Sequence, residues 1–257
     1  MGVLNVTPDS FSDGGRYLEP ALAVERAQQI RAEGAAIIDI GGESTRPGAT
    51  PVSLEEELRR VIPVVRALAR EDAPLISVDT SRPEVIEQAV AAGAAMINDV
   101  RALQRRGALA ALARSGAAAC LMHMRGEPST MQQTVRYTDV VAEVRAMLAA
   151  RLAACQEAGI ESERLCIDPG FGFGKLTEHN LELLRSLREL LVLDRPVLVG
   201  LSRKSMLKGL TGREPDARQA GSIALATAAV LNGAAIVRAH DVAATVDALR
   251  VAAALRE

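Results

Sequence analysis

Three polar side chains follow short apolar runs and could together bind one ligand edge. Asp79, Asn98 and Asp168 each come directly after such a run. Carboxylates pair well with a fork of N–H donors, so two carboxylates and an amide suit a ligand edge rich in N–H groups. These residues therefore predict a site for an amino-amidine edge.

A second set of side chains carries mainly hydrogen-bond donors. It lies near the ends of the first, second and last apolar runs and consists of Asn5, Thr45, Arg46, Arg238 and His240. Arg238 and His240 are two positions apart, and in a strand such residues point to the same side. Arginine pairs with anions, and a diphosphate usually brings Mg²⁺. The combination favours a ligand with an anionic tail.

The spacing of these residues leaves a structural alternative open. Asp79 and Asp168 could form internal ion pairs with Lys204 or Arg203, which lie in a Gly-Leu-Ser-Arg-Lys-Ser segment. Structural ion pairs also perturb pKa values, so titration behaviour alone would not separate the two interpretations.

The elements that would position these residues alternate about eight times along the chain. The predicted strands are 3–4, 37–38, 75–78, 96–97, 121–122, 165–167, 197–201 and 236–237, each followed by a polar residue. Alternating strands and helices imply a parallel sheet. Eight units in 257 residues favour a single-domain (β/α)₈ barrel over 1–257 rather than an open doubly wound sheet. In such a barrel the carboxyl ends of the strands form the active-site face.

Helices are predicted between the strands. Their ranges are 19–33, 54–70, 83–92, 107–115, 140–158, 178–191, 216–232 and 242–255. Ser53 and Ser81 have capping-box spacing, and Asp139 and Thr177 are further candidate caps. Gly-Ala-Ala occurs four times between a helix and a strand, where glycine can end a helix in the left-handed conformation. The first predicted strand begins almost at residue 1, so an N-terminal segment is expected to be missing.

Composition excludes several classes of protein. The net charge is −2 without a basic stripe, which argues against nucleic-acid binding. No apolar run reaches the roughly 18 residues of a membrane-spanning helix, and residues 1–4 lack a secretory pattern. The three cysteines, Cys120, Cys155 and Cys166, have no paired spacing, so a reducing, cytoplasmic location is expected.

Several segments resemble the dihydropteroate synthase family. Residues 1–15 (MGVLNVTPDSFSDGG) and 39–48 (DIGGESTRPG) resemble its first two signatures. The further matching blocks occur in order as SVDT at 77–80, INDV at 97–100, LMHM at 121–124, DPGFGFGK at 168–175, GLSRKS at 200–205 and RAHD at 238–241. The likeness covers nearly the whole chain.

The resemblance implies a (β/α)₈ fold and one reaction. In that reaction 6-hydroxymethyl-7,8-dihydropterin diphosphate condenses with 4-aminobenzoate to give 7,8-dihydropteroate and diphosphate. It also implies Mg²⁺, a homodimer, small-molecule substrates and sulfonamides as competitors of 4-aminobenzoate. The reaction would be a dissociative substitution without a covalent enzyme intermediate.

The resemblance also implies a role for each matching residue. Asp79, Asn98, Asp168 and Lys204 would bind the pterin edge and ring, with Met122 on the ring face. Asn5, Thr45, Arg46, Arg238 and His240 would bind the diphosphate, and Asn5 would ligate Mg²⁺. Phe11, Pro47, Phe173 and Ser202 would surround the 4-aminobenzoate. Catalysis would depend on Lys204, Asp168, Arg238 and His240, whereas Asp39 would support the second loop, residues 41–52, rather than touch substrate.

Two other functions fit parts of the pattern. A methyltetrahydrofolate-binding methyltransferase domain would share the Asp79, Asn98 and Asp168 set but would need no diphosphate site. A non-catalytic pterin-binding paralogue should have lost residues such as Lys204 or Arg238, and both are present.

Overall fold

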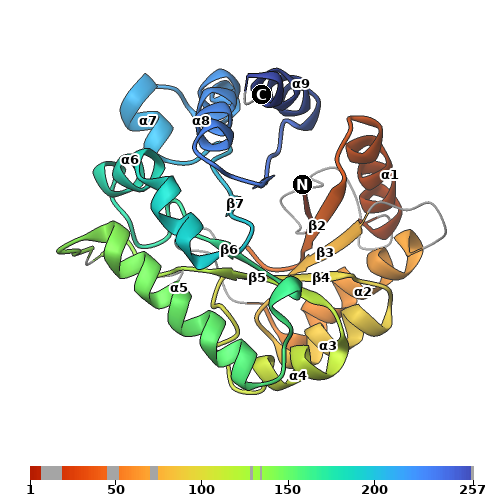
Figure 1. Cartoon of the computed structure of the whole chain (residues 1–257). Coiled ribbons are helices and arrows are strands. Elements are labelled where there is room, and N and C mark those ends of the chain that lie inside the picture. The colour runs from red at the N-terminus through yellow and green to blue at the C-terminus, as the bar shows by residue number, and fades with distance from the viewer. Residues whose placement is uncertain (7–18, 45–51, 70–74, 128–129, 134, 256–257) are drawn as a thin grey trace.

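The computed structural model describes residues 1–6, 19–44, 52–69, 75–127, 130–133 and 135–255. Short parallel strands alternate with helices along the described chain (Figure 1). The strands are β1 Gly2–Asn5, β2 Ile37–Gly41, β3 Leu75–Asp79, β4 Met96–Asp99, β5 Ala118–Met122, β6 Leu165–Asp168, β7 Leu198–Val199 and β8 Ile236–Val237. Every predicted strand is therefore present.

The helices surround these strands (Figure 1). They are α1 Glu19–Ala32, α2 Leu54–Leu68, α3 Pro83–Ala91, α4 Ala108–Ser115, α5 Val140–Glu157, α6 Thr177–Arg185, α7 Met206–Thr211, α8 Gln219–Leu231 and α9 Val242–Ala254. Short 3₁₀ helices occur at η2 Ser162–Arg164, η3 Leu187–Leu193 and η4 Pro215–Ala217.

The strands close into a barrel. Strands β1 to β6 form one continuous parallel ladder in sequence order, and β7 pairs with β8. Isolated bridges join Ile167 to Val197 and Gly2 to Ala239, which connects the pair to β6 on one side and to β1 on the other. This closure confirms the predicted (β/α)₈ barrel.

Two apolar clusters fill the molecule. The larger one packs the helices onto the strands and is mostly aliphatic, as the low aromatic content of the sequence requires. The smaller one contains Met96, Cys120, Cys166 and Leu198, with Met1 packed against it. Because Met96 begins β4, we infer that this cluster forms the floor of the barrel, below the carboxyl ends of the strands.

The repeated Gly-Ala-Ala segments work as predicted. The glycine of each copy has a positive φ, between 75° and 102° in three copies and 115° at Gly93. Each glycine follows a helix and precedes a strand, so one turn geometry is used four times. A side chain would be strained at this backbone conformation.

Two of the predicted helix caps are confirmed and two are wrong. Ser53 and Asp139 accept hydrogen bonds from the N–H groups of Glu56 and Ala142. Ser81 does not cap α3, because its hydroxyl donates to Asp99 instead. Thr177 is the first residue of α6 rather than its cap.

Two predicted helices are also shorter than expected. The range 178–191 divides into α6 and the 3₁₀ helix η3, and the range 216–232 divides into η4 and α8. In the first case the buried leucines continue across the break, so they mark a buried face without fixing where the helix ends. In the second case η4 has no buried residue.

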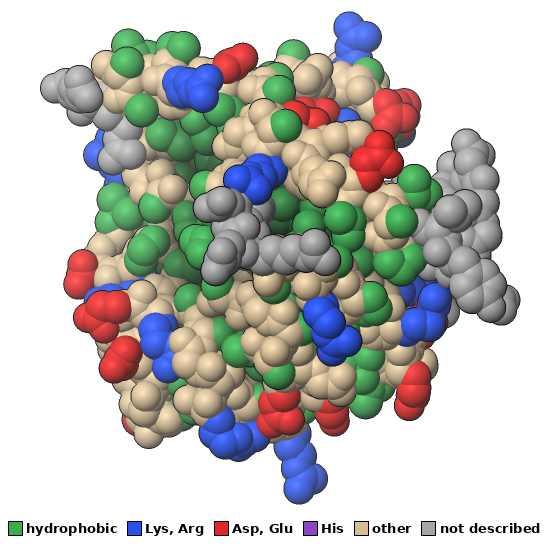
Figure 2. Space-filling model, turned by 90° about the vertical axis from the view of Figure 1, so that its right-hand side faces the viewer, with side chains coloured by type: hydrophobic (Ala, Val, Ile, Leu, Met, Phe, Trp, Pro, Cys, Tyr) green, Lys and Arg blue, Asp and Glu red, His purple; other side chains and the backbone are tan. Residues whose placement is uncertain are grey.

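The surface agrees with the predicted charge pattern. Figure 2 shows acidic and basic side chains interspersed on the face drawn. Within the described residues, no helix combines the length and the hydropathy that crossing a membrane would require.

Candidate active site

Asp79, Asn98 and Asp168 lie at the carboxyl ends of β3, β4 and β6, as predicted. Asp79 and Asn98 are direct neighbours in the parallel register. Asn98 is 4% exposed and Asp168 is 5% exposed, while Asp79 is half-buried. Asp168 also accepts a hydrogen bond from the N–H of Gly170 at 2.7 Å, which fixes the start of the glycine-rich segment. The structure therefore brings the predicted acceptors to one face.

Burial changes the titration of both carboxyl groups. It raises the pKa of Asp79 to about 7, and Arg238 opposes this rise because its guanidinium favours the carboxylate. Burial also raises the pKa of Asp168, while the N–H of Gly170 and the ammonium of Lys204 oppose it. These carboxyl groups would gain most from a ligand that donates hydrogen bonds to them.

Arg238 contacts the acceptor set directly. Its Nε lies 2.6 Å from Oδ2 of Asp39, and its Nη2 lies 3.2 Å from Oδ2 of Asp79. Asp79 is thus in an internal ion pair, as the structural alternative expected, but with Arg238 rather than with Lys204 or Arg203. Arg203 instead pairs with Asp241 at 2.6 Å.

Asp39 contacts three neighbouring parts of the barrel, and its predicted support of the second loop stays a prediction because residues 45–51 lie outside the described residues. Its side chain is fully buried and accepts hydrogen bonds from Ser77, Asn98 and Arg238. Because these donors come from β3, β4 and the end of β8, Asp39 joins three walls of the barrel. The position of Asp39 at a predicted strand end marked it as a candidate. Sequence spacing could not show which residues its side chain contacts.

Lys204 lies beside Phe173 and close to the acceptor set. Its Nζ is 4.3 Å from the centre of the Phe173 ring, a cation–π distance. Burial lowers the pKa of Lys204 to about 8, and the carboxyl of Asp168 opposes this change. The lysine and the ring come from the segments after β7 and β6, so the structure brings these predicted residues together.

Asn5, Arg203 and His240 line a pocket of about 610 Å³ between β1, α1 and the end of β8. Ser202 lies next to this pocket, and its Oγ is 3.0 Å from Nδ1 of His240. Burial, followed by the charge of Arg238, lowers the pKa of His240 to about 4. The imidazole is therefore neutral at pH 7 and can offer one N–H to an anion.

A buried lysine, which the sequence did not reveal, anchors the glycine-rich segment. Lys175 is 3% exposed, and its Nζ donates to the carbonyl oxygens of Gly170 and Phe173 at 2.9 and 3.1 Å. The same Nζ lies 2.8 Å from Nδ1 of His123, whose pKa burial lowers to about 3. Met122 precedes His123 and is 3% exposed. Lys175 thereby fixes the segment that carries Phe173.

The base of the second loop has its own buried pair. Arg82 lies 2.8 Å from the carboxylate of Glu57, which also accepts from Thr80 at 2.6 Å. Glu43 and Val52 lie near the two ends of this loop, and the carboxylate of Glu43 accepts a hydrogen bond from the N–H of Val52. The remaining predicted site residues, Phe11, Thr45, Arg46 and Pro47, lie outside the described residues.

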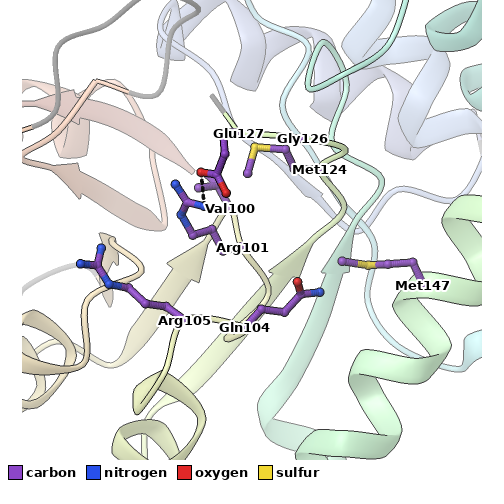
Figure 3. A pocket seen from close by; sticks show the side chains of 8 residues that line it. All are labelled: Val100, Arg101, Gln104, Arg105, Met124, Gly126, Glu127 and Met147. Carbon is purple, nitrogen blue, oxygen red and sulfur yellow. Dashed lines mark ion pairs between the residues drawn. The ribbon is translucent and has the colours of Figure 1, made fainter. Parts of the chain in front are cut away.

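Another pocket, of about 420 Å³, opens between the segments after β4 and β5 (Figure 3). It is lined by Val100, Arg101, Gln104, Arg105, Met124, Gly126, Glu127 and Met147. Arg101 and Glu127 form an ion pair of 2.5 Å there. None of the predicted site residues lines this pocket, and Glu127 pairs with one of its two arginines, Arg101.

Comparison with known proteins identifies the class that this barrel and its site define. The model of the family described as pterin binding enzyme matches residues 1–240, and the chain belongs to this family. The dihydropteroate synthase of Escherichia coli K12 is 53% identical over 251 residues, which cover 98% of this chain and 89% of that protein. Within the family, the relatives are thus dihydropteroate synthases.

Solved structures give the same result. A Yersinia pestis dihydropteroate synthase in a sulfonamide drug complex has a TM-score of 0.95 and 49% identity, covering 100% of this chain and 93% of that one. The Xanthomonas albilineans enzyme with 4-aminobenzoic acid has a TM-score of 0.94 and 54% identity, covering 100% and 92%. The predicted family is therefore confirmed, whereas the assigned roles of individual residues stay predictions.

Proposed function

We infer that this protein is a dihydropteroate synthase that joins 6-hydroxymethyl-7,8-dihydropterin diphosphate to 4-aminobenzoate. The observation that carries this conclusion is the cluster of Asp79, Asn98 and Asp168 beside Lys204 at one end of the barrel. Relatives that share about half of their residues with this chain, over nearly its whole length, support this conclusion. The products are 7,8-dihydropteroate and diphosphate.

The pterin would bind at the acceptor cluster. Asp79, Asn98 and Asp168 supply acceptor oxygens for its amino-amidine edge, and Lys204 supplies a cation beside the ring. Met122 would pack on the ring face. Carboxylates desolvated by burial gain most from such donors, because hydrogen bonds to the charged form offset the cost of burial.

The diphosphate would lie near the ends of β1 and β8. Arg238, His240 and Asn5 supply donors or a metal-ligating oxygen there, together with Thr45 and Arg46. Among the described residues no group of three or more His, Cys, Asp or Glu side chains could hold a metal ion by itself. Mg²⁺ normally takes one or two protein oxygens plus substrate phosphates, so Asn5 fits such a site. When bound, the ion would neutralise charge on the diphosphate.

The 4-aminobenzoate would lie against Phe173 and Ser202. Phe11 from the loop 5–15 and Pro47 from the loop 41–52 would cover it. Phe173 offers an aromatic face, and Lys175 holds its backbone in place. Sulfonamides would compete at this position because they resemble 4-aminobenzoate. We expect added 4-aminobenzoate to relieve that inhibition.

The chemistry requires positioning and charge stabilisation rather than an enzyme nucleophile. The C–O bond to the diphosphate breaks, and its electron pair leaves with the diphosphate. The pterin ring spreads the resulting positive charge, and Asp79 and Asp168 stabilise it. The lone pair of the 4-aminobenzoate amine then forms the C–N bond, and the nitrogen passes its extra proton to solvent water. Preorganised charges supply much of the acceleration in such reactions.

The direct test is incubation of the protein with the pterin diphosphate, 4-aminobenzoate and Mg²⁺, followed by detection of 7,8-dihydropteroate. Lys204→Ala and Asp168→Asn should each lower kcat/KM by at least about a hundredfold, since each removes a charged group next to the reacting pterin. Lys208→Ala, at an exposed lysine on α7, is the matched control and should retain activity. Full turnover in both site variants would refute the site, and pterin binding without turnover in the wild type would indicate a non-catalytic paralogue.

We also propose a homodimer in a reducing, cytoplasmic compartment. Exposed apolar side chains occur just before α6, on η3 and on α7, at Leu176, Leu191, Val192 and Leu210, and α6 adjoins both other elements. The cysteines are all buried and unpaired. Sedimentation equilibrium tests the dimer, and a monomer at micromolar concentration would contradict it.

A further inference from the structure

Asp39 is the most completely enclosed acidic side chain at the site, and all of its described contacts are to protein donors. Oδ1 accepts from the hydroxyl of Ser77 at 2.6 Å. Oδ2 accepts from Nδ2 of Asn98 at 3.1 Å and from Nε of Arg238 at 2.6 Å. With no exposed surface, Asp39 cannot itself reach a ligand. Any effect on the reaction must pass through these neighbours.

The contact with Asn98 determines what that side chain can offer. A carboxamide has one end that donates and one that accepts. A carboxylate only accepts, so Asp39 holds the NH₂ end and turns Oδ1 away from itself. Among the described residues, Oδ1 of Asn98 is buried and has no hydrogen-bond partner. A buried acceptor without a partner is costly and is expected to meet a donor when a ligand binds.

We propose that Asp39 is a positioning residue that makes Asn98 an obligate acceptor, and that it thereby selects a pterin by its donor-rich edge. This proposal rests on the proposed function. With Asn98 oriented in this way, residues 79, 98 and 168 each offer an acceptor oxygen, and Asp39 takes up one of the two N–H groups of Asn98. An analogue whose 2-amino group is replaced by an oxo group would turn an acceptor toward this cluster and be rejected. A free carboxamide could instead rotate and accommodate it.

The same carboxylate oxygen holds Arg238, so two effects of Asp39 must be separated. The effect of Asp39 through Asn98 should appear in the affinity for the pterin ring alone, without a diphosphate. We therefore choose 6-hydroxymethylpterin and its 2-oxo analogue as probes, with affinity measured by calorimetry. Binding of inorganic diphosphate with Mg²⁺, measured separately, reports on the effect through Arg238.

Asp39→Ala should weaken 6-hydroxymethylpterin binding by about tenfold, the change expected when one acceptor to a buried ligand is lost. It should also reduce the preference for the pterin over its 2-oxo analogue, because Asn98 can then rotate. Asp39→Asn keeps an acceptor oxygen. It should therefore retain most of the affinity for 6-hydroxymethylpterin and most of the preference over the 2-oxo analogue. In an Asn98→Ala background, Asp39→Ala should add little, since its target is already absent.

Ile38→Val is the matched control. Ile38 is the fully buried neighbour of Asp39 on β2, and the change lowers stability without touching the network. It should leave both probe affinities unchanged. If Asp39→Ala fails to fold, Asp39→Ser carries the same prediction with a smaller disturbance.

Three results would overturn the proposal: unchanged ligand preference in Asp39→Ala, equal losses in Asp39→Ala and Asp39→Asn, or additive losses with Asn98→Ala. Failure of the proposed function would look different. In that case the wild-type protein itself would not prefer 6-hydroxymethylpterin and would form no dihydropteroate.

Discussion

At the scale of single residues, the site depends on ionisable groups whose pKa values burial has moved toward neutrality. Asp79 rises to about 7, and Lys204 falls to about 8. In the proposed mechanism their useful forms are the carboxylate, which would accept hydrogen bonds from the pterin, and the ammonium, which would donate hydrogen bonds to acceptor atoms of the pterin ring. Both forms coexist only in a narrow range of pH.

We therefore expect a bell-shaped pH profile of kcat/KM, which reports the groups of the free enzyme. Activity should fall below about pH 7 as Asp79 gains a proton and above about pH 8 as Lys204 loses one. Lys204→Arg should lower the rate but remove the alkaline decline, because arginine stays charged. An alkaline decline that persists in this variant would show that another group controls it.

At the scale of elements, the segment after β6 is held by one buried lysine. Lys175→Met should lower the free energy of unfolding by about 1–3 kcal/mol, because buried carbonyl oxygens of Gly170 and Phe173 lose their donor. It should also raise the KM for 4-aminobenzoate, since Phe173 is less well placed. Urea unfolding and steady-state kinetics measure the two effects.

The pH dependence of the free energy of unfolding provides a second test of the role of Lys175. Burial lowers its pKa from 10.5 to about 7, so between these values the unfolded chain binds more protons than the folded one. Stability should therefore rise with pH across that window, and Lys175→Met should lose part of the rise. Lys208→Met, on an exposed side chain, is the control and should keep the wild-type dependence.

The elements themselves were largely predictable, and their contacts were not. Apolar runs and Gly-Ala-Ala turns located all eight strands, because both patterns reflect local backbone and burial requirements. The partners of Asp39 could not be predicted because they lie 38 to 199 residues away in the chain. Ser81 was misjudged because Asp99 competes for its hydroxyl. Lys175 has no local pattern that distinguishes a buried lysine from an exposed one.

At the scale of the whole molecule, the first residues complete the barrel. Met1 and Val3 donate to carbonyl oxygens of Val237 and Ala239, and Gly2 bridges to Ala239. A Cβ on Gly2 would lie 2.3 Å from Cγ2 of Ile30, a buried branched side chain that cannot easily move. The barrel therefore needs a glycine where β1 meets α1.

Gly2→Ala should lower the free energy of unfolding by about 1–3 kcal/mol, the usual cost of overpacking a core. Chemical denaturation provides the measurement. Gly209→Ala is the control, because a Cβ there would meet only Thr177 at an ordinary 3.7 Å within helix α7. It should be neutral or slightly stabilising. Equal effects of the two changes would contradict the packing argument.

The unequal strands of the barrel have a consequence for the order of events in turnover. Asp79, Asn98 and Asp168 belong to the continuous ladder β1–β6, whereas Ser202, Lys204, Arg238 and His240 follow β7 and β8, which are two residues long and lie outside that ladder. Sectors with few backbone hydrogen bonds open at lower free energy. Amide protons near β7 and β8 should exchange with solvent before those of β3 and β4. We therefore expect the proposed diphosphate site near the end of β8 to open more readily than the acceptor cluster on β3, β4 and β6.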